Sequence, residues 1–261
     1  MRKKDRGLLI KLIVLLIIGS FSFQAYNYYN QDTVKIANWN LQIFGTAKAS
    51  DADLMNAYED KIEDYDIIFV QEIRDKSETA FPQLCARLEN YSCLSSSRAG
   101  RSSSKEQYGV IYKEGINVTY FKDYNPDSLD RWERPPIRVD FNVNGYEFSV
   151  YNIHTDPDAV KSELSSLEDV VEDKGNVIVI GDLNADCSYY NNAEANGDEF
   201  DSWSWIIPDS EDTTTSNSYC AYDRIILNND AYNEYISYGV DKTGIDSDVS
   251  DHYLVWVEVG I

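Results

Sequence analysis

The sequence has 261 residues, of which 23 are Lys or Arg, 45 are Asp or Glu and only two are His, so its formal net charge is −22. With 43% hydrophobic residues it can build a packed core, which excludes a disordered or fibrous chain, and its 26% charged residues exclude a multi-span membrane protein. The acidic balance also excludes a broad basic surface. A polyanionic partner would therefore need local arginines and bound cations to overcome the repulsion.

The first 25 residues have the pattern of an export signal. Basic residues come first, at Arg2, Lys3, Lys4 and Arg6. They precede an apolar run over residues 7–23 that only Lys11 interrupts. This pattern predicts a signal peptide over residues 1–25, or alternatively an uncleaved N-terminal anchor, followed by a short leader over residues 26–33. We expect a secreted or periplasmic protein that contacts a membrane only through an uncleaved segment.

From residue 34 onward short β-rich runs alternate with amphipathic stretches, and no linker or repeat divides residues 34–261, which predicts one domain. Strands are expected at 34–41, 66–71, 108–112, 118–124, 137–143, 146–153, 176–180, 223–227 and 253–259, and helices at 52–63, 78–88 and 159–172. Asn144-Gly145 predicts a hairpin with a type I′ turn. This mixture of connections favours an α/β sandwich of two stacked sheets between helices over a doubly wound parallel sheet.

Four cysteines lie in this region, at Cys85, Cys93, Cys187 and Cys220. An even number in an exported chain predicts disulfides, and the spacing does not fit a zinc site. Sequence order permits three pairings. We favour the local one, which joins Cys85 to Cys93 and Cys187 to Cys220.

Six predicted strands carry polar residues at one end that a purely structural strand does not need. These segments are 38–40, 71–72, 152–154, 181–186, 222–224 and 250–252. Any one of them is ordinary turn chemistry, since Asp and Asn favour turns. Six together, including both histidines of the chain, predict a shared site.

The residue types in these segments indicate metal-dependent chemistry. Carboxylate and amide oxygens suit Mg²⁺, Mn²⁺ or Ca²⁺ rather than zinc, and the candidates are Asn40, Glu72, Asp182, Asn184 and Asp251.

Two histidines, His154 and His252, suit proton transfer near neutral pH. A cation with two imidazoles is suited to phosphoester hydrolysis, in which one imidazole activates water and the other protonates the leaving oxygen. Arg74, Arg101 and Arg134 are candidates to hold neighbouring phosphates.

Eight segments in order carry a resemblance to a known family. They are NWNLQIFG, VQEIRD, GRSSSKEQY, NIHTDP, GDLNADCSY, IPDSEDTTT, CAYDRI and SDHY. From about residue 34 to 259 the chain resembles the deoxyribonuclease I family of the endonuclease/exonuclease/phosphatase superfamily. The resemblance implies a four-layer α/β/β/α sandwich with two stacked mixed sheets and the site at one edge.

The resemblance also implies roles for individual residues. His154 is similar to the family's general acid, with Glu106 oriented against it, and His252 to the general base, with Asp223 as its partner. Which imidazole acts first as the acid stays open. The residues at metal-binding and phosphate-contacting positions are Asn40, Glu72, Asp182, Asn184 and Asp251, with Asp182 also counted as catalytic. The phosphate-contacting arginines are Arg74, Arg101 and Arg134.

Further implied features are structural. Cys187 and Cys220 match the family's disulfide, and Asp212 with Thr214 and Ser216 matches a calcium-binding loop. The segment 123–136 is shorter than in the family and lacks a small disulfide, which argues against a second calcium site, with Asp130 its only obvious ligand.

The chain departs from the family at two DNA-contacting positions, Ser104 in place of a Tyr and Gln42 in place of an Arg. Losing an aromatic wedge and a cation in the minor groove should weaken the grip on bent duplex DNA.

The expected function is an exported endonuclease that hydrolyses DNA with low sequence specificity to 5′-phosphate ends. We expect Mg²⁺ or Mn²⁺ for catalysis, Ca²⁺ for structure, and a monomer without a stable protein partner. The alternative is a phosphodiesterase of the same superfamily that acts on a lipid headgroup or an inositol phosphate. A non-enzymatic binding module would require lost catalytic residues, and none is missing.

Overall fold

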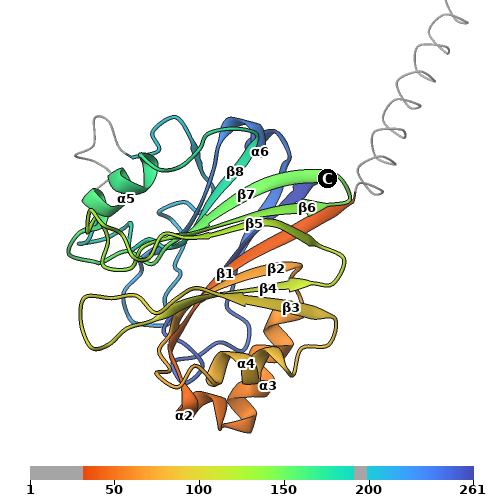
Figure 1. The fold of residues 1–261 in the computed structure, drawn as a ribbon, viewed down its shortest axis with the longest axis vertical. Coiled ribbons are helices and arrows are strands. Elements are labelled where there is room, and N and C mark those ends of the chain that lie inside the picture. Colours follow the sequence, from red (N-terminus) through yellow and green to blue (C-terminus); the bar gives the residue numbers. More distant parts are fainter. Residues whose placement is uncertain (1–31, 191–198) are drawn as a thin grey trace, which may run out of the picture.

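The computed structural model describes residues 32–190 and 199–261, so the predicted signal peptide and most of the leader lie outside the described residues. Two six-stranded sheets are stacked face to face (Figure 1). The first has the order β11-β12-β1-β2-β4-β3 and the second β5-β6-β7-β8-β10-β9. Within the first sheet the strands are β1 (Thr33–Phe44), β2 (Ile67–Ile73), β3 (Tyr91–Ser95), β4 (Gln107–Lys113), β11 (Tyr235–Asp241) and β12 (Leu254–Gly260). The second contains β5 (Asn117–Asp123), β6 (Ile137–Val143), β7 (Tyr146–Asn152), β8 (Asn176–Asp182), β9 (Ser204–Trp205) and β10 (Asp223–Leu227).

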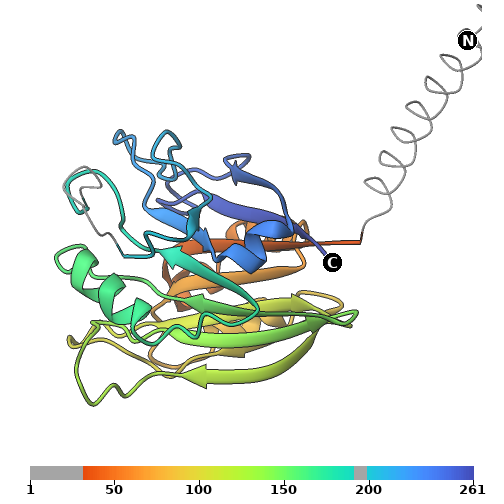
Figure 2. The same cartoon turned by 90° about the horizontal axis from the view of Figure 1, so that it is seen from above.

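Helices cover the outer face of each sheet (Figures 1 and 2). The first sheet is covered by α2 (Thr46–Ala49), α3 (Ala52–Ile62) and α4 (Ala80–Cys85), and the second by α5 (Val160–Glu168). The short α6 (Asn229–Asn233) follows β10, and its buried Ala231 belongs to the cluster between the sheets. The predicted four-layer α/β/β/α architecture is therefore confirmed. Among the described residues, no helix has both the length and the apolar character needed to span a membrane.

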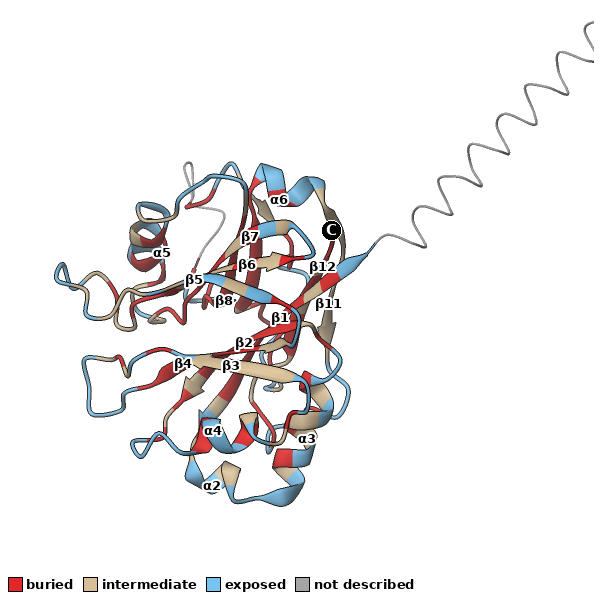
Figure 3. Ribbon diagram, turned by 45° about the vertical axis from the view of Figure 1, so that its right-hand side comes forward, coloured by how far each residue is buried: buried red, intermediate tan, exposed pale blue. Residues whose placement is uncertain are grey.

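Three apolar clusters fill the spaces between the four layers (Figure 3). Strands alternate their side chains between faces, so the strands that are buried on both faces contribute to two clusters. In β2, for example, Ile67 and Phe69 join the cluster between the sheets, whereas Ile68 and Val70 pack under the helices of the first sheet. Burial on both faces explains why these strands read as continuous apolar runs in the sequence.

Hairpins and crossovers both occur, as the sequence predicts. β1 and β2 are parallel, as are β7 and β8, and the other neighbouring pairs are antiparallel. At the β6–β7 turn Val143 pairs with Tyr146, and Asn144 and Gly145 have φ values of 54° and 97°. Both central residues are left-handed, as a type I′ turn requires.

Several elements differ from the sequence-based predictions. β3, β9, β11, α2 and α6 were not predicted, because they are short or, like β11, half-buried along their whole length and so lack a hydrophobic alternation. The predicted helix 78–88 is shorter, since the chain leaves α4 at Cys85 and turns at Asn90, with φ 64°, into β3. The predicted helix 159–172 ends at Glu168, one residue after its last buried Leu.

Candidate active site

The direction of the strands brings the polar segments to one edge of the sandwich. The carboxyl ends of the parallel strands β1, β2, β7 and β8 deliver one set of side chains, namely Asn40, Glu72, His154 and Asp182. Because β4, β10 and β12 run antiparallel to β2, β8 and β1, the residues at their amino ends reach the same edge. These residues are Glu106, Asp223 and His252.

Most of these side chains continue the rows that fill the space between the sheets. In β8, Ile178 and Ile180 belong to the core between the sheets, and Asp182 is two residues further on the same face. Asp223 likewise precedes the inward-facing Ile225 of β10. The layer between the sheets therefore changes from apolar to acidic at this edge, which places carboxylates against each other across the two sheets.

Both imidazoles meet at one carboxylate oxygen. The Nε2 atoms of His154 and His252 lie 3.3 Å and 3.6 Å from Asp182 Oδ2. Behind the rings, His154 Nδ1 is 2.7 Å from Glu106 Oε1 and His252 Nδ1 is 2.8 Å from Asp223 Oδ2. An acid behind each ring fixes the ring orientation and directs its Nε2 atom to the site.

Neighbouring charges shift the pKa values of the two histidines and of Asp182. Burial alone would lower the pKa of His252, but the carboxylates of Asp223 and Asp182 outweigh it and raise that pKa to about 10. The pKa of His154 is also raised, because Glu106 and Asp182 outweigh burial and the positive charge of Arg134. For Asp182, burial is outweighed by the two imidazoles, which lower its pKa. The neighbouring carboxylates therefore stabilise the protonated form of both rings.

Glu106 is the centre of a second charge cluster. Only 2% of its surface is exposed, and besides His154 it faces Arg74 Nε and Arg134 Nε, each 3.2 Å from a carboxylate oxygen. Burial opposes ionisation, but the neighbouring cations lower the pKa of Glu106 to about 2. Arg134 also donates to the carbonyl oxygens of His154 and Thr155. The two arginines are thus anchored at the site by Glu106.

Glu72 and Asp182 are candidate cation ligands that Asn40 links to each other. Asn40 Nδ2 donates to both, at 3.4 Å to Glu72 Oε1 and 3.0 Å to Asp182 Oδ2. In this arrangement Asn40 offers its amide nitrogen to the carboxylates, while its Oδ1 accepts from the Gln42 backbone N–H at 2.9 Å. Glu106 and Asp223 face the Nδ1 side of the rings, whereas Asp182 faces the Nε2 side, and Glu72 lies 3.3 Å from Arg74 Nε. The oxygens of Glu72 and Asp182 are hard ligands of the kind that Mg²⁺ or Mn²⁺ prefers.

Backbone geometry at the site is restrictive. Glu72 and Asn184 have φ values of 58° and 48°, a left-handed conformation that is uncommon outside glycine and concentrates at functional sites. At Gly181 a Cβ atom would lie 1.9 Å from the carbonyl oxygen of Ile153. Only glycine therefore lets β8 approach the segment that carries His154. Asn184 donates to the Thr155 carbonyl oxygen at 3.1 Å and reinforces this contact.

Other predicted site residues lie further out. Asp251 is at the rim, with its Oδ1 atom 3.9 Å from His252 Nε2 and its side chain 49% exposed. Arg101 is exposed and bound to acids: its Nε donates to Asp130 Oδ1 at 3.0 Å, and its backbone N–H to Glu133. Arg101 thus forms an ion pair with Asp130, and its predicted phosphate contact stays a prediction. Ser104 is exposed in the same loop.

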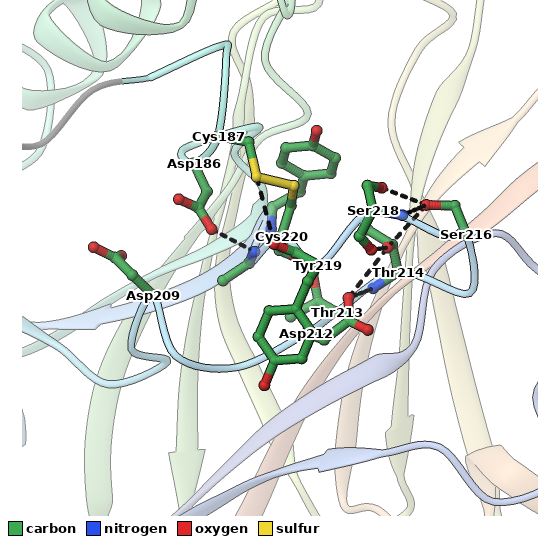
Figure 4. The surroundings of a disulfide bond; sticks show 12 residues. Asp186, Cys187, Asp209, Asp212, Thr213, Thr214, Ser216, Ser218, Tyr219 and Cys220 are labelled. Carbon is green, nitrogen blue, oxygen red and sulfur yellow. Dashed lines mark hydrogen bonds between the residues drawn. A yellow bond between two sulfur atoms is a disulfide. The ribbon is translucent and has the colours of Figure 1, made fainter.

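The predicted calcium loop adjoins the site and a disulfide (Figure 4). Asp212 Oδ1 accepts from the Thr214 backbone and hydroxyl, both at 3.2 Å, and Thr214 Oγ1 lies 3.2 Å from Ser216 Oγ. These are oxygen donors in one loop, which suits Ca²⁺. Backbone bonds from Thr215 to Asp251 and from Tyr253 to Thr213 tie this loop to the segment around His252.

Both disulfides have the predicted local pairing. Cys85 bonds to Cys93, and Cys187 bonds to Cys220. The second bridge joins the segment after Asp182 to the segment before Asp223 (Figure 4). It therefore closes a loop between two strands that both deliver site residues.

Sequence reasoning missed three buried amides behind the site. Asn38, Gln71 and Asn152 are fully buried between the two sheets and hydrogen-bond to each other. Each lies in a polar segment that the sequence analysis noted, but no role was given to them. The sequence did contain a signal for their burial. Asn38 and Gln71 follow the core residues Ile36 and Phe69 by two positions, so they point to the same inner face of their strands.

Comparisons with known proteins agree with this geometry. A family model described as the Endonuclease/Exonuclease/phosphatase family matches residues 37–252. Among solved structures, humanized D. rerio TDP2 has a TM-score of 0.65 at 14% identity, covering 88% of this chain and 99% of that one. An endonuclease/exonuclease/phosphatase from Bacteroides vulgatus has the same TM-score at 16% identity, covering 88% and 100%. The fold and the family match define a member of the endonuclease/exonuclease/phosphatase class.

Relatives with clear sequence identity narrow this class. Deoxyribonuclease-1 of Gallus gallus is 34% identical over 230 residues, which cover 79% of this chain and 81% of that protein. The Bos taurus enzyme is 32% identical, covering 85% and 82%, and the Homo sapiens enzyme is 33% identical, covering 75% and 77%. The chain belongs to the deoxyribonuclease I family.

Proposed function

We propose that the protein is a divalent-metal-dependent endonuclease that hydrolyses DNA phosphodiester bonds. The observation that carries this proposal is the pair of imidazole Nε2 atoms on either side of Asp182 Oδ2, each ring backed by its own buried acid. Hydrolysis of a phosphodiester needs one group that takes a proton from water and another that gives a proton to the leaving oxygen. His154 and His252 supply two such groups at one place.

The residues of the site have different roles in the proposed reaction. Glu106 and Asp223 hold the Nδ1 side of each ring, so proton transfer takes place at Nε2. Glu72 and Asp182 would hold the cation, and Asn40 keeps the two carboxylates together. When bound, a divalent cation stabilises the negative charge that develops on the phosphate oxygens. A cation held by Glu72 and Asp182 would also offset their negative charge, which would favour the neutral form of the ring that acts as the base.

DNA is the proposed substrate because the relatives at 32–34% identity are deoxyribonucleases. Arg74 and Arg134, anchored by Glu106, present guanidinium groups at the same edge for phosphate oxygens. With a net charge of −22, attraction to DNA is local rather than spread over the surface. Backbone recognition of this kind carries no sequence information, so we expect low sequence specificity and, as in the family, 5′-phosphate ends.

Export is proposed on independent grounds. The two disulfides require an oxidising compartment, and the first 25 residues have the signal pattern. We therefore place the enzyme outside the cytoplasm.

Replacement of the histidines tests the proposed chemistry. His154→Ala and His252→Ala should each lower the rate of plasmid nicking by at least about 10²-fold, because each removes a proton-transfer group. Circular dichroism and thermal unfolding serve as controls for folding. Near-normal turnover in both variants would contradict the assignment.

Substrate and metal are tested on the wild-type protein. Supercoiled DNA, single-stranded DNA, RNA and a chromogenic phosphodiester are compared side by side in Mg²⁺, in Mn²⁺ and in excess chelator. We expect DNA cleavage that chelation abolishes and Mg²⁺ or Mn²⁺ restores. Preference for the small ester would favour the phosphodiesterase alternative, and cleavage in excess chelator would disprove metal dependence.

A further inference from the structure

Three amide side chains form a closed cluster in the middle of the sandwich. This amide cluster consists of Asn38 from β1, Gln71 from β2 and Asn152 from β7, and none of the three has any exposed surface. It lies between the apolar core and the site, because Gln71 directly precedes Glu72, and Asn152 lies two positions before His154. It therefore joins both sheets directly beneath the catalytic edge.

Within the amide cluster, Gln71 only donates hydrogen bonds and Asn38 only accepts them. Gln71 Nε2 donates to Asn38 Oδ1 at 2.5 Å and to Asn152 Oδ1 at 3.1 Å, and Asn152 Nδ2 donates to Asn38 Oδ1 at 3.1 Å. Two donors at Asn38 Oδ1 fix the orientation of this amide, so its Nδ2 points away from the cluster. There it donates to Asp223 Oδ1 at 3.4 Å.

Asp223 thus has two engaged oxygens. Oδ1 accepts from Asn38, and Oδ2 accepts from His252 Nδ1. The side chain is fully buried, and an ionised carboxylate without hydrogen-bond donors would be strongly disfavoured there. One donor of the amide cluster, Asn38 Nδ2, reaches this carboxylate, which the Thr213 side chain also contacts. The Asn38 contact restrains the plane of the carboxylate, and that plane sets the orientation of the His252 ring.

We propose that Asn38 is a positioning residue that orients His252 through Asp223, with Gln71 and Asn152 fixing the Asn38 amide. This inference deepens the proposed function and rests on it for its kinetic test. Folding by itself does not require the cluster, because apolar side chains of similar volume could fill the same space, and Gln71 Oε1 is buried without a hydrogen-bond partner. The cluster is better explained by what it does for Asp223.

The kinetic test uses Asn38→Leu, which keeps the side-chain volume close and removes the donor. We expect kcat on DNA to fall about 10- to 100-fold, as for other partners that orient an active-site histidine, while KM stays within about twofold. The matched control is Asn228→Leu. Asn228 is another buried, fully hydrogen-bonded amide, but it lies at the opposite end of β10 from Asp223. This control should lower stability and leave kcat of the folded protein unchanged.

A double-mutant cycle identifies the route of the effect. In an Asp223→Asn background, Asn38→Leu should change kcat by less than about twofold, because the group through which it acts is already altered. Asn38→Thr, which restores a donor, should recover part of the loss. Additive effects in the cycle, a change confined to KM, or an equal loss of kcat in the Asn228 control would overturn the proposal.

A second readout does not depend on nuclease activity. Because the chain has only two histidines, NMR of ¹⁵N-histidine-labelled, metal-free protein resolves their ring signals. Asn38→Leu should shift or broaden the His252 Nδ1–H signal and leave that of His154 in place, whereas Asn228→Leu should change neither. An unchanged His252 signal in folded Asn38→Leu protein would refute the positioning role. Absence of DNA cleavage by the wild type would instead refute the proposed function alone. If Asn38→Leu does not fold, Asn38→Ala, which also lacks the donor, takes its place and should give the same change in the His252 signal.

Discussion

Glu106→Gln tests how much the buried charge cluster contributes to folding. The wild-type carboxylate faces His154 Nδ1 at 2.7 Å and two guanidinium groups, with the Nε atoms of Arg74 and Arg134 at 3.2 Å. A glutamine carbonyl can replace one carboxylate oxygen, but its NH₂ group must then face an arginine. The pKa of Glu106 is lowered from 4.5 to about 2. At about 1.4 kcal/mol per tenfold change in acidity, this corresponds to about 3 kcal/mol of folding free energy at neutral pH.

The stability difference between wild type and Glu106→Gln should depend on pH. A carboxylate whose pKa is lowered by folding contributes stability above its ordinary pKa of 4.5 and loses it as the pH falls through the folded value of about 2. Urea unfolding of metal-free protein between about pH 7 and about pH 2.5 measures this. The stability difference between wild type and Glu106→Gln should be about 3 kcal/mol at the upper end and shrink below about pH 4.5.

Glu163→Gln is the matched control. Glu163 is also buried, but it accepts from the backbone N–H groups of Glu133 and Asp156 rather than from arginines, and burial raises its pKa. Its ionisation therefore opposes folding as the pH rises above 4.5, and the difference from wild type should change with pH in the opposite direction. A pH-independent difference for Glu106→Gln, or the same trend in both variants, would refute the reasoning.

Two further predictions concern the structural links around the site. Replacing both members of the Cys187–Cys220 bridge by serine should lower the free energy of unfolding by about 3.7 kcal/mol, against about 2.5 kcal/mol for Cys85–Cys93, because the sequence separations are 33 and 8 residues. Denaturant unfolding measures both values, and the reverse order would contradict the loop-entropy argument. Added Ca²⁺ should raise the Tm of the wild type, because an ion that binds only the folded protein stabilises it by mass action. This gain should disappear when Asp212 is replaced by Ala. If calorimetry shows an equal gain in both proteins, the ion binds elsewhere.

Much of this protein could be predicted from the sequence because its information is local. The Asn144-Gly145 turn, the buried strands and the order of chemical motifs each depend on short segments, and the structure confirms the turn and the sandwich. The pairing of Cys187 with Cys220 also followed from proximity in the chain. By contrast, β11 was missed because its strand is half-buried along its whole length, so no alternation marks it.

Only the tertiary structure decided how the site is arranged. The sequence places Asn38, Asp182 and His252 in separate segments, and nothing local states that two imidazoles share one oxygen of Asp182 or that Asn38 reaches Asp223. Nothing in the motif of Arg101 indicates its ion pair with Asp130 either, because that residue lies 29 positions further along the chain. Periodicity records which face a residue takes within its own strand, whereas the distance between residues of two stacked sheets depends on how those sheets pack. The sequence therefore determined which residue types the site contains, whereas the packing of the two sheets determined the distances between them.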